Sequence, residues 1–346
     1  MIRDLLPRLT AGGSLTREET AATVRGMVRG EEPEEDVAAF LVALARRGET
    51  EAELLGGAEA LRAEAVPFPS TGGPLLDTCG TGGDSRATFN VSTAVAFVAA
   101  AAGVPVAKHG NRSVSSRCGS ADVLEALGAT IDLGPDAAAR VLEESGFTFL
   151  YARRFHPAIK RVAAVRERLG IRTLFNWLGP LANPAGASHQ LVGVPDPGRV
   201  ETVARVLGGL GVARALVVHG AGGLDELGLE PGNIAVESSW ATSAAAITSR
   251  AHEIDARDLG LRPAPPEALL GGDAAENAAI LRRVFAGERG PKRDAVLLNA
   301  AAALWIAGAV ATLRAGAVYA GELIDCGAAT LTLDRYVALS NREGAA

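Results

Sequence analysis

A glycine-rich loop lies between a short apolar run and an apolar helix. The loop is Gly80-Thr81-Gly82-Gly83-Asp84, and the helix opens with Asn90-Val91-Ser92-Thr93. Glycines let backbone N–H groups approach an anion closely, and the first turn of a helix directs its positive end at the same place. The spacing fits neither a dinucleotide fingerprint nor a Walker A sequence. Alone, the pattern is as consistent with an ordinary glycine turn and hydroxyl helix caps as with a phosphate site.

A second polar segment follows the next predicted strand, 104–107. It consists of Lys108-His109-Gly110-Asn111-Arg112-Ser113-Val114-Ser115-Ser116, and Gly119-Ser120-Ala121-Asp122 then begins a helix. One of only three lysines, an arginine and several hydroxyls therefore gather at the carboxyl end of a strand, where they suit phosphate oxygens. A solvated basic turn is the alternative, which such a dense polar segment in an Ala- and Val-rich chain disfavours.

Two adjacent carboxylates follow a third predicted strand, 215–219. The loop after it ends in Gly222-Gly223-Leu224-Asp225-Glu226. Magnesium takes one or two carboxylates together with waters and substrate phosphates. An acidic pair alone indicates only a solvated surface. The two segments suited to bind anions, 80–93 and 108–122, are here called anion cradles. Together with the acidic pair they predict a Mg²⁺-assisted polyphosphate substrate.

The composition excludes several classes of protein. The chain has 346 residues, 48% of them hydrophobic, and a net charge of −6. An acidic chain is a poor general binder of nucleic acid or of a membrane surface, because both need a positive field. The longest apolar stretches, 91–107 and 300–313, are too short or too interrupted to span a bilayer and predict buried helices. Three cysteines give no disulfide framework, so we expect a reduced, cytoplasmic compartment.

The chain divides into a helical start and an alternating remainder. Thr16 with Glu19 and Thr50 with Glu53 fit capping boxes, and Pro33 suits a first helical turn. From residue 71 on, strands alternate with helices, which predicts an α/β fold with a central, largely parallel sheet. The further predicted strands are 129–133, 147–151, 190–194 and 234–237, with a helix at 200–210. We therefore expect a helical domain at 1–70 and an α/β domain at 71–346.

Taken in order, these segments resemble the anthranilate phosphoribosyltransferase family over essentially the whole chain. The segments are GTGGD, NVST, KHGNRSVSS…GSAD, FNWLGPLANP and HG..GLDE. The KHGNR…GSAD block is specific, whereas GTGGD alone is shared with pyrimidine nucleoside phosphorylases. The resemblance implies transfer of the phosphoribosyl group of PRPP to the amine of anthranilate in tryptophan biosynthesis. It also implies a small helical domain hinged to the larger one, a segment near 160–184 packed on it, and a homodimer formed through it.

The resemblance carries three sets of site residues onto this chain. PRPP would be held by Gly80, Gly82, Gly83, Asp84, Thr88, Asn90, Val91, Ser92, Thr93, Lys108, Asn111, Arg112, Ser115, Ser116 and Ser120. Anthranilate would be held by Gly80, His109, Asn111, Arg166, Gly179 and Pro180. Two Mg²⁺ ions are expected, one held with the help of Ser92 and the other by Asp225 and Glu226. No residue is singled out as a catalytic base, and His109 either accepts a proton or only orients the substrate.

Two alternatives remain at this point. A pyrimidine nucleoside phosphorylase would use the same glycine loop but needs no carboxylates for Mg²⁺. A non-catalytic nucleic-acid-binding homologue of the same fold is disfavoured by the acidic net charge.

For the homodimer, the apolar residues Phe40, Leu41 and Leu44 exceed what three helices bury alone, which suggests a contact surface there.

Overall fold

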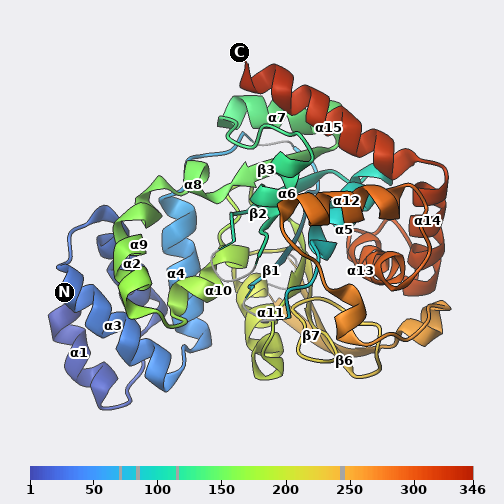
Figure 1. The fold of residues 1–346 in the computed structure, drawn as a ribbon. Helices are drawn as coiled ribbons and strands as arrows, with labels where there is room; N and C mark the ends of the chain where they lie inside the picture. Colours follow the sequence, from blue (N-terminus) through green and yellow to red (C-terminus); the bar gives the residue numbers. More distant parts are fainter. Residues whose placement is uncertain (70–71, 83–85, 114–116, 242–245, 346) are drawn as a thin grey trace.

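A computed structural model describes residues 1–69, 72–82, 86–113, 117–241 and 246–345. A group of helices at one side adjoins a larger α/β region (Figure 1). No helix within the described ranges is both long enough and apolar enough to cross a membrane.

The first helices form as their capping residues predict. They are α1 Ile2–Thr10, α2 Arg17–Arg29, α3 Glu34–Arg47 and α4 Glu51–Ala63. Thr16 and Thr50 both complete capping boxes with the glutamate three residues later. Pro33 precedes α3 as its N-cap residue instead of lying in its first turn.

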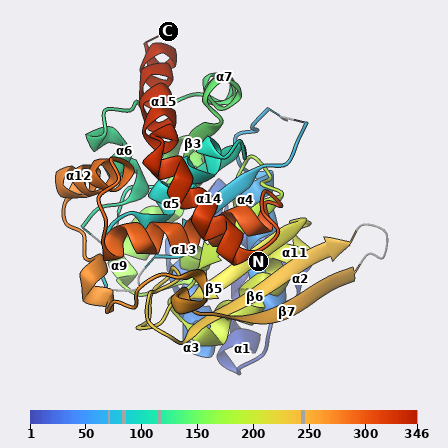
Figure 2. The same cartoon turned by 90° about the vertical axis from the view of Figure 1, so that its right-hand side faces the viewer.

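A seven-stranded sheet forms the centre of the larger region, in the order β3-β2-β1-β4-β5-β6-β7. The first five of these strands are parallel, and β6 and β7 run antiparallel at one edge (Figure 2). The chain order reverses between β1 and β4, which is where open sheets of this kind bind ligands. The strands are β1 Leu76–Gly80, β2 Val106–Gly110, β3 Phe147–Tyr151, β4 His189–Gly193, β5 Arg214–His219, β6 Asn233–Ala241 and β7 Ala246–Ile254.

Both faces of the sheet are covered, and alternate strand residues enter different apolar cores. Leu216 and Val218 of β5 join the core beneath α5 and α13, whereas Ala215 and Val217 join the core shared with α11. The helices of the first core are α5 Val91–Ala101, α6 Ser120–Ala126, α7 Pro135–Ser145, α12 Ala274–Phe285, α13 Pro291–Ile306, α14 Leu313–Asp325 and α15 Ala328–Gly344.

The second core continues from the sheet into the first helices. It includes α11 (Val200–Gly209), α9 (Lys160–Leu169) and α10 (Leu174–Leu181) together with α1 to α4. Helix α9 contacts α2 and α3, and α10 contacts α4, so these later segments lie among the N-terminal helices (Figure 1). A domain boundary at residue 70 stays a prediction.

Several expectations from the sequence were wrong in detail. Residues 129–133 form no strand, because the backbone N–H of Thr130 donates to the Ser340 hydroxyl of α15 instead of to a strand. The apolar stretch 300–313 is interrupted, since α13 ends at Ile306 and α14 begins at Leu313. The stretch 91–107 holds α5 and the start of β2. Strand β7 was missed because its residues are largely polar at an edge of the sheet.

The apolar residues expected to form a dimer surface are buried within the chain itself. Phe40, Leu41 and Leu44 are fully inaccessible to solvent, because α9 and α10 pack with α1 to α4 and make the bundle larger than three helices. A dimer contact through these three side chains is therefore ruled out.

Candidate active site

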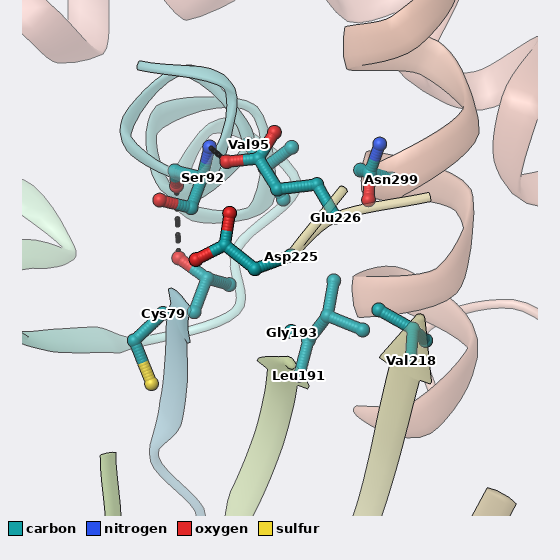
Figure 3. A pocket seen from close by; sticks show the side chains of 10 residues that line it. Cys79, Ser92, Val95, Leu191, Gly193, Val218, Asp225, Glu226 and Asn299 are labelled. Atoms are coloured by element: carbon teal, nitrogen blue, oxygen red, sulfur yellow. Dashed lines mark hydrogen bonds between the residues drawn. The ribbon is translucent and has the colours of Figure 1, made fainter. Parts of the chain in front are cut away.

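The carboxyl ends of β1, β4 and β5 converge with the loop that carries Asp225 and Glu226 (Figure 3). This close approach depends on glycines. A Cβ atom at Gly193 would lie 1.5 Å from the carbonyl oxygen of Asp225, and one at Gly80 would lie 2.3 Å from its Oδ2. The last residues of β1 and β4 must therefore lack side chains for the acidic loop to reach the switch point of the sheet.

The two carboxylates lie on the N–H groups of the predicted phosphate cradle. Asp225 Oδ2 accepts from the backbone N–H of Gly82 at 2.8 Å. Glu226 Oε1 accepts from the backbone N–H of Ser92 at 3.1 Å (Figure 3). The N-cap residue of α5, Asn90, makes no side-chain cap. Two N–H groups suited to an anion are thus in place, and the chain's own carboxylates hold them.

Three asparagines that the sequence analysis missed hold this arrangement. Asn299 of α13 bonds both the N–H and the carbonyl of Leu227, and Asn233 bonds Gly228 in the same way. Asn277 of α12 donates to Asn90 Oδ1 at 2.9 Å. A lone asparagine within the apolar run of α13 is the only signal in the sequence that could have pointed to them.

Lys108 belongs to the glycine-loop cradle and not to the second polar segment. It lies inside β2, only 2% exposed, and its ammonium donates to the Thr78 carbonyl and, at 3.2 Å, to Ser92 Oγ. Burial lowers its pKa, while the carboxylate of Asp77, also missed from the sequence, acts in the opposite direction. Thr93, in contrast, is wholly buried, with a hydroxyl that has no hydrogen-bond partner among the described residues.

The second polar segment is held mainly by its own ion pairs. Arg112 pairs with Glu125 and Asp122, and hydrogen bonds to Glu125 raise its pKa. Ser120 Oγ donates to the Asn111 carbonyl at 3.4 Å. The cradle expected here is therefore only partly assembled among the described residues.

The remaining predicted PRPP residues fall into two groups. Val91 begins α5, and Thr88 forms an isolated bridge with Leu270. Outside the described residues lie Gly83, Asp84, Ser115 and Ser116.

His109 faces the side of β2 opposite to Lys108, as alternation along a strand requires. Its Nδ1 lies 3.2 Å from the Gly179 carbonyl oxygen, and its backbone N–H donates to Asp77. A carbonyl only accepts, so the proton is assigned to Nδ1, and Nε2 carries a lone pair. That atom is buried with no partner among the described residues, and burial lowers the pKa of His109 to about 3.

Gly179 of α10 contacts His109, and Arg166 of α9 contacts the same helix. The Arg166 guanidinium lies 5.4 Å from the centre of the Phe175 ring, and burial lowers its pKa. Within the described ranges no carboxylate lies within ion-pair distance of it. Pro180 is buried, whereas Gly179 is exposed and borders open space. Arg172, which the sequence did not single out, donates to the Gly82 carbonyl at 3.0 Å and so joins the two sides of the site.

The acidic pair fits magnesium better than a metal held by protein alone. The described residues contain no cluster of three or more His, Cys, Asp or Glu side chains that could hold an ion. Two carboxylates on a phosphate cradle are the donor set of a Mg²⁺ ion that takes its other ligands from water and phosphate oxygens.

Comparison with known proteins gives a consistent result over the whole chain. Residues 3–65 match the helical bundle domain of a glycosyl transferase family, and residues 72–330 match its a/b domain. The chain is 52% identical to an anthranilate phosphoribosyltransferase of Roseiflexus castenholzii, over 98% of both sequences.

Solved structures agree with these matches. The crystal structure of anthranilate phosphoribosyltransferase from Thermus thermophilus superposes with a TM-score of 0.90 at 45% identity, covering 98% of this chain and 99% of that one. The Saccharomyces cerevisiae enzyme in complex with PRPP and Mg shares the fold, with a TM-score of 0.87 at 23% identity over 99% and 98% of the two chains. The chain therefore belongs to the anthranilate phosphoribosyltransferase family.

Proposed function

We propose that this chain transfers the phosphoribosyl group of PRPP to the amine of anthranilate, giving N-(5-phosphoribosyl)anthranilate and pyrophosphate in tryptophan biosynthesis. One observation carries the proposal. The carboxylates of Asp225 and Glu226 lie directly on the Gly82 and Ser92 N–H groups. Mg²⁺ ligands and phosphate donors thus occupy one place, as a magnesium-bound polyphosphate substrate requires.

One half of the site, here called the donor half, binds PRPP, the donor of the phosphoribosyl group. It holds the pyrophosphate group by fixed positive charge. The N-terminus of α5 and the glycine loop supply backbone N–H groups, and Lys108 supplies a buried ammonium beside Ser92. Breaking the bond between ribose C1 and pyrophosphate places negative charge on the leaving group. Once the bound substrate has displaced the carboxylates of Asp225 and Glu226 from the Gly82 and Ser92 N–H groups, these donors stabilise that charge without further reorganisation during bond breaking. When bound, Mg²⁺ would be held by Asp225, Glu226 and Ser92 and would neutralise phosphate charge.

The other half of the site, here called the acceptor half, binds the molecule that accepts the phosphoribosyl group. It holds an aromatic acid with its amine directed at ribose C1. Arg166 supplies a guanidinium for the anthranilate carboxylate. Gly179 and Pro180 supply the wall beside the ring, and His109 Nε2 supplies a hydrogen-bond acceptor for the amine. An aromatic amine is largely unprotonated at neutral pH. His109 therefore orients it, and a pKa of about 3 prevents the imidazole from retaining the proton that is released.

A pyrimidine nucleoside phosphorylase is the weaker alternative. It binds free phosphate and has no use for the acidic pair, and the curated relatives are named as transferases. The deciding experiment measures loss of anthranilate fluorescence on addition of PRPP, with and without Mg²⁺. Loss that requires both additions supports the proposal, and phosphorolysis of a pyrimidine nucleoside in its place would overturn it.

Three further features are part of the proposal: two Mg²⁺ ions per site, a homodimer formed through the N-terminal helices, and a cytoplasmic location. The dimer no longer rests on Phe40, Leu41 and Leu44, which are buried. Light scattering that gives only a 35.4 kDa species at micromolar concentration would remove the dimer.

A further inference from the structure

The carboxyl end of α10 lies where the N-terminal helices meet the sheet. A helix leaves its last carbonyl groups without partners inside the helix. At the end of α10, each of the four carbonyls from Gly179 to Ala182, the C-cap residue, accepts a hydrogen bond from a side chain. Three of the donors come from three different elements and the fourth from a loop residue, so a single helical turn is bonded to distant parts of the chain.

Two of the donors come from the sheet. His109 of β2 donates from Nδ1 to the Gly179 carbonyl at 3.2 Å. Gln190 of β4, which is 0% exposed, donates from Nε2 to the Pro180 carbonyl at 3.0 Å. These bonds fix the two residues of the acceptor wall directly against parallel strands.

The other two donors come from the helical side. Arg62 of α4 donates from Nε to the Leu181 carbonyl at 2.7 Å and from Nη1 to the Leu210 carbonyl at 3.3 Å. His156, between α8 (Ala152–Phe155) and the 3₁₀ helix η1 (Pro157–Ile159), donates from Nε2 to the Ala182 carbonyl at 2.8 Å. Arg62 thus places a positive charge at the negative ends of both α10 and α11.

The next residue extends the connection. Asn183 donates to Asp77 Oδ2 at 2.8 Å and to the Ala107 carbonyl at 2.9 Å, which joins it to β1 and β2. The turn 179–183 is therefore bonded at every residue to a different neighbour.

Besides His109, two of the donors also keep an unsatisfied atom. Among the described residues, Gln190 Oε1 and Arg62 Nη2 are buried without a hydrogen-bond partner. Burying a polar atom unpaired costs stability, so an apolar side chain would pack at lower cost at either position. Packing alone does not account for these residue types, whereas a required hydrogen bond to α10 does.

We propose that Gln190, Arg62 and His156 are positioning residues for the acceptor, holding Gly179 and Pro180 at the distance that the anthranilate ring requires. The inference rests on the proposed function. The three side chains act through the backbone of α10 and touch neither the reacting atoms nor PRPP. Removing one donor leaves a buried carbonyl unpaired and lets the wall shift, which should weaken acceptor binding about tenfold and leave PRPP binding within twofold.

The test compares steady-state kinetics of Gln190→Leu and Arg62→Met with those of two matched variants. Asn277→Leu removes a buried amide of similar size that holds Asn90, on the donor half. Ser145→Ala removes a buried hydroxyl that, among the described residues, bonds only the backbone of Val141 and Phe147, at the amino end of β3 and so at the opposite end of the strands from the site. We expect a raised KM for anthranilate in the first two variants, a raised KM for PRPP in Asn277→Leu, and neither change in Ser145→Ala.

The outcomes distinguish a failure of the positioning role from a failure of the proposed function. If both KM values rise together in Gln190→Leu and Arg62→Met, or if only thermal stability falls, the positioning role is overturned while the proposed function stands. If the wild-type chain shows no PRPP- and Mg²⁺-dependent loss of anthranilate fluorescence, the proposed function fails and the acceptor role fails with it. Two independent donors keep the test informative if one variant does not fold.

Discussion

The two halves of the site are built in opposite ways. In the donor half, the N–H groups of Gly82 and Ser92 bond to carboxylates of the same chain, which a substrate anion must displace. In the acceptor half, the backbone carbonyls around Pro180 are bonded to the buried Gln190 and the partly buried Arg62, and no group of the chain has to be displaced for the substrate to bind. A highly charged ligand supplies enough interaction to rearrange its site. A small aromatic acid supplies much less, so its wall must already be in place.

The comparison is tested most severely at the acidic pair. Asp225→Asn with Glu226→Gln keeps oxygens that can accept from Gly82 and Ser92, so the fold should persist. It removes both negative charges offered to Mg²⁺, and we expect turnover to fall at least about 100-fold. Assays across a Mg²⁺ titration, with thermal melting as the control for folding, measure the effect. Near-normal turnover at any Mg²⁺ concentration would contradict the assignment.

Lys108→Met removes the only cationic side chain bonded to Ser92 in the described structure. It also leaves the fully buried Asp77 without its neighbouring ammonium. We expect PRPP affinity to fall about 100-fold, with a loss of roughly 3 kcal/mol in stability. Isothermal titration with each substrate measures the first effect. The exposed Lys160 of α9 provides the control, since Lys160→Met should change neither, and a loss confined to anthranilate would contradict the assignment.

The donor half could be predicted from the sequence because its residues are unusual where they stand. Adjacent acids after an apolar strand, a glycine run and a rare lysine all differ from an Ala- and Val-rich background. Their exact placement could not be predicted, however. Lys108 lies within β2 instead of after it, and its bonds to Thr78 and Ser92 depend on which strands are neighbours.

The hydrogen bonds that hold the end of α10 could not be predicted, because the groups that accept them are backbone carbonyls. Any residue type at Leu181 or Ala182 offers the same oxygen, so the sequence carries no mark of the bond. The donors are single polar residues far away along the chain, Arg62 lying 119 positions before its partner. The prediction of a strand at 129–133 was wrong for a related reason. Alternating apolar residues predict burial on one side, but only a neighbouring strand makes a strand.

Arg166→Ala tests the acceptor half directly. The guanidinium is half-buried over Phe175 without a carboxylate partner in the described part of the chain, so the substrate carboxylate would be its partner. A charge-assisted bond in a partly desolvated site contributes about 1.5–2.5 kcal/mol, or about 10- to 70-fold in affinity. We expect the KM for anthranilate to rise by that factor and the KM for PRPP to stay nearly constant.

Arg168→Ala is the matched control on the same helix. Its guanidinium is exposed and paired with Glu34 at 2.6 Å, so its loss should cost little. An equal effect of the two substitutions, or a parallel loss of PRPP binding, would move the carboxylate site elsewhere.

The smallest effect concerns pH, and it distinguishes the buried acceptor wall from the charged donor cradle. Burial lowers the pKa of His109 to about 3, with the nearby His156 ring, Lys108 and Arg62 acting in the same direction. Its pKa in the unfolded chain is about 6.5, so the unfolded chain binds the proton more tightly. The contribution of His109 to stability is therefore complete above about pH 6.5 and is lost as the pH falls from there towards about 3.

Other groups titrate over part of the same range, so the prediction is a difference between two proteins. Burial raises the pKa of Glu49 and of Asp77, and these carboxyls oppose the histidine effect in both wild type and variant. Between about pH 6 and 5, the wild type should lose about 1 kcal/mol more than His109→Gln in its free energy of unfolding. Urea unfolding at several pH values gives both slopes. Parallel slopes would mean that the imidazole is solvated, and the acceptor wall would then not be the rigid half of the site.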